Sequence, residues 1–130
     1  MRRLLTALFA LLFVIVFNAS YAADAGPTLN MPLPPLPDNQ EMLVLTIDVA
    51  PGQTSNPHRH NAHVFVYILS GSMNMQVEGG PLVQLFPGDM FYESPENIHA
   101  VSDNASQTEP AKFIVHIIKT IDAPVSVPAN

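Results

Sequence analysis

The sequence contains no cysteine, which excludes disulfides, thiol nucleophiles and thiolate metal ligands. Basic residues are also scarce, because five Lys and Arg stand against eleven Asp and Glu, for a formal net charge of −6. Nucleic-acid backbones and anionic membrane surfaces are bound by clusters of Lys and Arg. We therefore expect neither nucleic acid nor a membrane surface as a partner.

Long apolar runs are limited to the N-terminus, where residues 4–17 follow Met1-Arg2-Arg3. A basic head, an apolar middle and the small residues Ser20 and Ala22 are typical of a secretory signal peptide. We predict cleavage after Ala22, with cleavage after Ala25 as the alternative. An uncleaved anchor is disfavoured because a membrane span needs roughly 20 apolar residues. The protein is therefore expected to be exported, periplasmic or secreted, and free of the membrane after cleavage.

Helical periodicity is missing too, and short strand-like runs separated by Gly and Pro turns take its place. The expected strands are 42–49, 63–69, 72–77, 82–86, 89–93, 98–102 and 112–121. This pattern predicts an all-β sandwich or barrel. We divide the chain into a signal peptide (1–22), a proline-rich arm (23–41), one domain (42–121) and a C-terminal tail (122–130). The arm either packs across a partner subunit or is a disordered leader.

Histidine is concentrated in one place, since three of the five histidines lie between His58 and His63. Residues i and i+2 of a strand point to the same face, so His58 and His60 can aim at one point. Imidazole is the commonest protein ligand for Zn, Fe, Ni and Cu. A His-x-His pair alone is weak evidence, because a metal site needs at least one more ligand from elsewhere.

These residues carry a resemblance to the cupin superfamily. Pro51-Gly52, five residues, His58-Arg59-His60 and then Gly71 are similar to the first cupin motif, and Pro87-Gly88-Asp89 followed by His99 is similar to the second. The resemblance spans about 42–121 and implies a cupin-type double-stranded β-helix, or jelly-roll barrel. It also implies that His58, His60 and His99 bind a divalent metal near the barrel centre, with Fe, Mn, Zn, Ni or Cu as the possible ions.

The glutamate of the first motif is missing, because its slot holds Val64, or Phe65 with the longer spacing. Three alternatives stay open. Three histidines suffice, as in some cupin oxygenases; another side chain, His63 or Glu93, takes the place of the glutamate; or the site binds no metal. The second motif also departs from the family, with Ser94 and Glu96 in its proline and glycine slots and Asp103 in its asparagine slot.

The function that the resemblance implies is a metal-dependent small-molecule protein. If it is an enzyme, a dioxygenase-like oxidoreductase is the expectation, although no residue pattern identifies a reaction. The alternatives are a non-catalytic module that binds a small ligand or metal, and a metal-free structural barrel filled by side chains such as Val64, Val66 and Ile68. The resemblance also implies a homodimer.

Overall fold

The computed structural model describes residues 29, 31–32 and 36–129. Within these residues there is no helix, and hence none long and apolar enough to cross a membrane. The strands are β1 (Gln40–Val49), β2 (His58–Arg59), β3 (His63–Ser70), β4 (Met73–Val77), β5 (Val83–Leu85), β6 (Met90–Glu93), β7 (His99–Asn104), β8 (Ala111–Thr120) and β9 (Val127–Pro128). The predicted signal peptide and much of the predicted arm lie outside the described residues.

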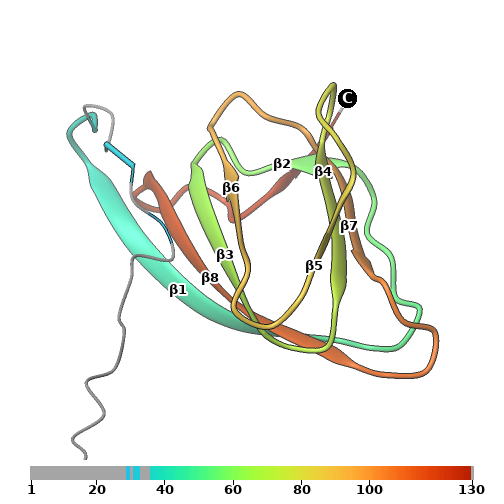
Figure 1. Cartoon of the computed structure of the whole chain (residues 1–130). Helices are drawn as coiled ribbons and strands as arrows, with labels where there is room; N and C mark the ends of the chain where they lie inside the picture. The colour runs from blue at the N-terminus through green and yellow to red at the C-terminus, as the bar shows by residue number, and fades with distance from the viewer. Residues whose placement is uncertain (1–28, 30, 33–35, 130) are drawn as a thin grey trace, which may run out of the picture.

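The strands form two antiparallel sheets that face each other (Figure 1). One sheet has the order β1-β8-β3-β6, and the other has the order β5-β4-β7-β2-β9. Strands that are distant in sequence are neighbours in both sheets, as in β1 with β8 and in β4 with β7. The prediction of an all-β jelly-roll is therefore confirmed.

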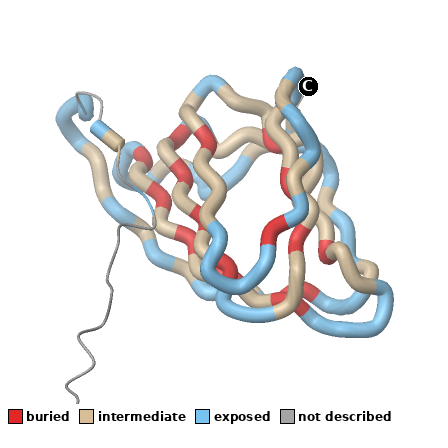
Figure 2. Tube along the Cα trace, viewed as in Figure 1, coloured by how far each residue is buried: buried red, intermediate tan, exposed pale blue. Residues whose placement is uncertain are grey.

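The strand residues alternate between the interior and the surface, and Figure 2 shows the buried positions recurring along the strands. In β3, Val64, Val66 and Ile68 are buried, while the residues between them are half-buried on the opposite face. This period of two is what a strand with one face on a core requires. The core between the sheets thus draws aliphatic side chains and Met73 and Met75 from both sides.

The seven predicted strands correspond to the seven longer strands, with ends that differ by one or two residues. The two-residue strands β2 and β9 were not predicted, because two residues carry no periodicity. β9 belongs to the C-terminal tail and pairs with β2, through His58 with Pro128 and Arg59 with Val127. The tail is therefore part of the sheet that carries the histidines.

A buried asparagine fixes the loop between β7 and β8. The Nδ2 atom of Asn104 donates to the carbonyls of Val49, Ala50 and Glu109 at 3.2, 3.0 and 2.8 Å. Its Oδ1 atom accepts from the Ser106 amide at 2.9 Å. Asn104 lies one residue after Asp103, which occupies the asparagine slot of the family motif. Its side-chain amide therefore satisfies buried backbone groups, which are costly to leave unpaired.

Candidate metal centre

Three histidines meet at one end of the barrel interior. His58 begins β2, His60 follows that strand, and His99 begins β7. His58 and His99 are register partners, and cross-strand partners point to the same side of a sheet. One nitrogen from each of the three rings lies within 4.8 Å of the others. The structure thus brings together the histidines that the two motifs predicted.

Backbone carbonyls fix the tautomers of two of these histidines. The Nδ1 atom of His58 is 2.8 Å from the Asn56 carbonyl, and the Nδ1 atom of His60 is 2.7 Å from the Val125 carbonyl. A carbonyl only accepts, so each Nδ1 carries the proton and each neutral ring presents a lone pair on Nε2. These two Nε2 atoms face each other at 3.2 Å. Two lone pairs at that distance repel, unless a cation lies between them.

The residues around His60 favour its neutral, metal-binding form. Burial lowers the pKa of His60, because it removes the water that stabilises the imidazolium; the nearby imidazoles of His58 and His99 add to this. The Val125 carbonyl and the Glu93 carboxylate act in the opposite direction. The His60 ring therefore stays neutral, and a neutral imidazole is the form that binds a metal.

The structure places Glu93 beside the motif slot that lacks its acid. Glu93 in β6 is the register partner of Val64 in β3, and such cross-strand partners have Cβ atoms about 4.5–5.5 Å apart on the same face. Its side chain is only 2% exposed, and its Oε1 atom lies 3.1 Å from the Nδ1 atom of His99. A carboxylate on the neighbouring strand thus enters the space that the motif glutamate occupies from β3.

Three buried polar atoms of this end have no hydrogen-bond partner among the described residues: Glu93 Oε1, His99 Nδ1 and His99 Nε2. The 3.1 Å contact between Glu93 and His99 does not have hydrogen-bond geometry. Unsatisfied buried polar groups are rare because each costs free energy. An imidazole binds a metal through one nitrogen, so a divalent cation would satisfy one of the two His99 nitrogens, and the residues present fit a metal ion.

His63, the other substitute considered for the missing acid, lies elsewhere. It precedes Val64 in β3 and faces the opposite side of the sheet. Its Nδ1 atom is 2.7 Å from the Tyr92 hydroxyl, and the two rings stack with an interplanar angle of 11°. Of the two candidates, Glu93 contacts His99, whereas His63 contacts Tyr92.

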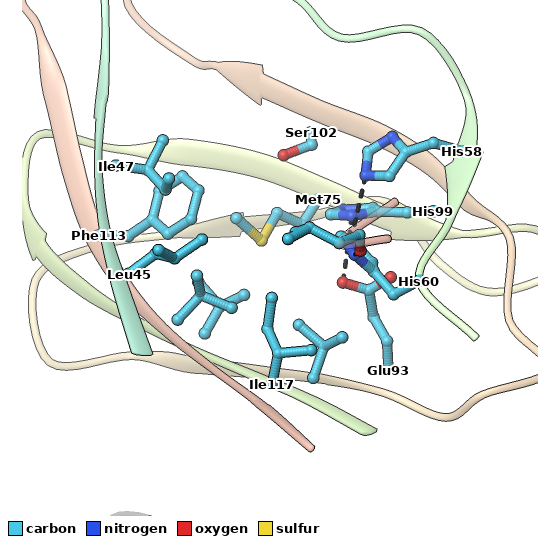
Figure 3. Close-up of a pocket in the computed structure, with 14 residues that line it drawn as sticks. Leu45, Ile47, His58, His60, Met75, Glu93, His99, Ser102, Phe113 and Ile117 are labelled. Carbon is cyan, nitrogen blue, oxygen red and sulfur yellow. Dashed lines mark hydrogen bonds and ion pairs between the residues drawn. The ribbon is translucent and has the colours of Figure 1, made fainter. Parts of the chain in front are cut away.

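A cavity of about 190 Å³ adjoins the histidines inside the barrel. Figure 3 shows His58, His60, His99 and Glu93 at one end and Leu45, Ile47 and Phe113 at the other, with Met75 between them. Val64 and Val66 line this space without filling it. A solid barrel packed with these side chains is therefore not what the structure has.

No pattern in the sequence indicates the Val125 carbonyl, which orients His60 from the C-terminal tail. A backbone carbonyl is present at every residue, so no residue type points to it. The pairing of β9 with β2, which positions it, joins segments almost seventy residues apart. The aromatic ring of Phe91 stacks against His99 with ring centroids 5.7 Å apart.

Comparison with known proteins follows this geometry. The family model described as "Cupin domain" matches residues 45–117, more than half of the chain. The chain belongs to the cupin family. A comparison with curated proteins gives no match.

Solved structures agree with this cupin fold. The DMSP lyase DddQ from Ruegeria pomeroyi DSS-3 has a TM-score of 0.60 at 22% identity, covering 68% of this chain and 43% of the lyase. An uncharacterized protein with a double-stranded β-helix domain from Klebsiella pneumoniae has a TM-score of 0.57 at 24% identity, and the match covers 73% of this chain and 79% of that protein. A salicylate 1,2-dioxygenase from Pseudaminobacter salicylatoxidans has a TM-score of 0.53 at 22% identity, and the match covers 58% of this chain and 21% of the dioxygenase. The chain spans less than half of the lyase, so these similarities concern the fold alone.

Proposed function

We propose that this cupin is a divalent-metal protein that binds a small molecule in the cavity beside the metal. The observation that carries the proposal is the pair of Nε2 lone pairs of His58 and His60 at 3.2 Å. Nitrogen–metal bonds of about 2.0–2.1 Å allow one ion to bond to both atoms. His99 is the third ligand, and the Glu93 carboxylate, 3.1 Å from the Nδ1 atom of His99, is our candidate for the role of the missing glutamate.

The residues around the ion have separate tasks. The carbonyls of Asn56 and Val125 hold His58 and His60 in the tautomer whose Nε2 binds metal. The Glu93 carboxylate adds a negative charge that compensates the cation. A metal held in this way supplies Lewis acidity at its open positions, and iron, manganese or copper adds redox chemistry. The identity of the ion depends on its supply as much as on these ligands.

The reaction class best compatible with the site is a dioxygenase-like oxidation of a molecule bound at the metal. Hydrolysis or isomerisation generally needs a positioned acid or base besides the metal. Apart from the three histidines and Glu93, the described cavity lining contains no titratable side chain. The same observation supports the second candidate, a module that binds metal and ligand without turnover.

The experiment is the metal content of untagged protein purified without chelators, beside the double variant His58→Ala/His60→Ala. The matched control is His63→Ala, which removes a nearby imidazole from the opposite face of the sheet. We expect near-stoichiometric metal in the wild type and in the control, and none in the double variant. Absence of metal in the wild type after attempted loading with Fe, Mn, Ni, Cu and Zn contradicts the proposal. Oxygen consumption in a substrate screen then separates the enzyme from the binding module.

We also propose a homodimer formed by the outer face of the sheet β1-β8-β3-β6. Met42 and Val44 on that face are 66% and 46% exposed, and register places Val44 in one row with His116 and Phe65. Exposed apolar side chains such as Met42 and Val44, beside the half-buried ring of Phe65, are compatible with a protein interface. Light scattering should give a dimer mass for the wild type and a monomer mass for Val44→Lys. A wild-type monomer contradicts the dimer.

Export remains a proposal that rests on the sequence features of residues 1–22. It predicts that the protein is found outside the cytoplasm with an N-terminus at Ala23. N-terminal sequencing of the protein from its native cell fractions tests this. An intact Met1 in the mature protein contradicts it.

A further inference from the structure

The cavity beside the histidines has two chemically different ends. All of its charged and metal-binding groups belong to His58, His60, His99 and Glu93. The far end in Figure 3 is formed by aliphatic and aromatic side chains of β1 and β8, including Leu45, Ile47 and Phe113. Ser102 is the one uncharged polar side chain in the described lining. A molecule in this cavity therefore meets polar chemistry mainly at the metal end.

No cationic side chain of the described residues is available to pair with an anionic group at the far end. The described part of the chain contains three Lys and Arg residues, and none of them lines the cavity. Arg59 donates to the Glu96 carbonyl, and Lys112 and Lys119 pair with the carboxylates of Asp48 and Glu41. Burying an unpaired charge among aliphatic side chains is strongly unfavourable. The part of the ligand that lies at the far end of the cavity therefore carries no negative charge.

A cationic far end is disfavoured as well. Recognition of ammonium groups relies on several aromatic faces that surround the cation. Among the apolar side chains lining the cavity, Phe113 is the only aromatic one in the described residues. One ring gives no cage, so the far end fits an uncharged apolar group.

The size of the cavity limits the apolar group to about one ring. Apolar cavities of about 150 Å³ bind benzene, and this one measures about 190 Å³. A single six-membered ring with a short polar head therefore matches the size of this cavity.

We infer that the ligand is a small molecule with one metal-chelating head and one uncharged, apolar body of about a single ring. This inference rests on the proposed metal site, because the head binds through the metal. The body contacts Leu45, Ile47 and Phe113. The class is set by the charge and size of the far end, independently of whether the molecule is oxidised or only bound.

Three hydroxamic acids with the same chelating head test the inference on the zinc-loaded protein. Benzohydroxamic acid carries an apolar ring, acetohydroxamic acid carries only a methyl group, and 4-carboxybenzohydroxamic acid carries a ring with a charged end. We expect calorimetry to give at least tenfold tighter binding for the benzo compound than for the aceto compound, because the ring is buried. The carboxylated compound should lose at least that gain.

Leu45→Phe narrows the apolar end without touching a histidine. It should weaken binding of benzohydroxamic acid about tenfold and leave zinc and acetohydroxamic acid unchanged. The matched control is Gln84→Phe, which places the same side chain on the exposed outer face of β5 in the other sheet and should leave the affinities for zinc and for both compounds unchanged. Equal affinities of the zinc-loaded protein for all three compounds overturn the inference while the metal site stands.

An experiment on the metal-free protein separates this inference from the proposed function. Benzene added to the metal-free protein should shift the methyl resonances of Leu45 and Ile47, and Leu45→Phe should abolish the shift of the Ile47 methyl resonances. Failure of the protein to hold zinc, with benzene still bound, overturns the metal proposal and leaves an apolar binding cavity. Zinc binding without benzene binding overturns the inference that the ligand has an apolar body.

Discussion

The two sheets of the barrel differ in construction and in what they carry. The sheet β1-β8-β3-β6 contains two ten-residue strands, β1 and β8, paired along their full length. In the other sheet, β2 and β9 have two residues each, and β2 pairs with β7 through a single register pair. All three histidines belong to this second sheet or follow directly from it. The long strands thus provide most of the regular pairing, while the short ones position the site.

A consequence of this difference is that stability and metal binding are expected to respond to different substitutions. The long strands bury alternate aliphatic side chains, and each contributes to the free energy of unfolding. Both ring nitrogens of His99 are unsatisfied among the described residues, so the histidine end is expected to contribute little to the metal-free fold. The following predictions test this separation.

Ile68→Ala in β3 should have the largest effect on stability. Ile68 is 1% exposed and does not line the cavity. Truncation of a buried Ile loses the hydrophobic contribution of the removed methyl groups and leaves a cavity, which together lower the free energy of unfolding by about 2–5 kcal/mol. Urea unfolding in the presence of a chelator measures this, and the metal affinity of the folded variant should equal that of the wild type.

The control for this comparison is His58→Ala/His60→Ala in the same metal-free assay, which should change the free energy of unfolding by less than about 1 kcal/mol, as expected outside a packed core. A loss of stability in the double variant as large as that in Ile68→Ala would show that the histidine end is also a structural core. The division between the two sheets would then be abandoned.

The same division explains which features the sequence predicts. The alternation Val64, Val66, Ile68 identifies β3 from local pattern, because one face of a long strand must be apolar. The motif spacing identifies His58, His60 and His99 as a group. Glu93 was one of two candidates for the missing acid, and its position opposite Val64 follows from the register of β6 against β3. Register is a tertiary property, so neighbouring residues in the sequence do not contain it.

Glu93→Gln should have opposite effects on metal binding and on metal-free stability. Loss of the charge should weaken metal binding by about 10–100-fold, the usual effect of removing a supporting carboxylate. The metal-free protein should become more stable by about 1 kcal/mol, because a buried carboxylate without a partner is costly. Metal titration and urea unfolding measure the two effects, and Glu96→Gln, in the exposed turn after β6, should change neither.

The exchange Val64→Glu/Glu93→Val sharpens this test. It moves the acid from β6 to its register partner in β3, where the cupin motif has it. Metal affinity should recover to within about tenfold of the wild type, since cross-strand partners point to the same space. An affinity for Glu93→Gln equal to that of the wild type would instead limit Glu93 to packing against His99.

The smallest expected effect comes from the C-terminal tail, the least regular part of the second sheet. A chain that ends at Ala123 lacks β9 and the Val125 carbonyl that fixes the tautomer of His60. Loss of such an orienting partner should weaken metal binding by about tenfold. Val125→Ala keeps the carbonyl and should bind metal within twofold of the wild type.

A spectroscopic measurement distinguishes orientation of His60 from general loosening of the fold. The ¹⁵N shifts of the His60 ring in the metal-free protein should report the Nδ1–H tautomer in the wild type and in Val125→Ala. In the shortened chain they should report a mixture of tautomers, because no carbonyl holds the Nδ1 proton. If the shortened chain keeps both the tautomer and the metal affinity, the tail only covers the barrel, and the short strands position the site without it.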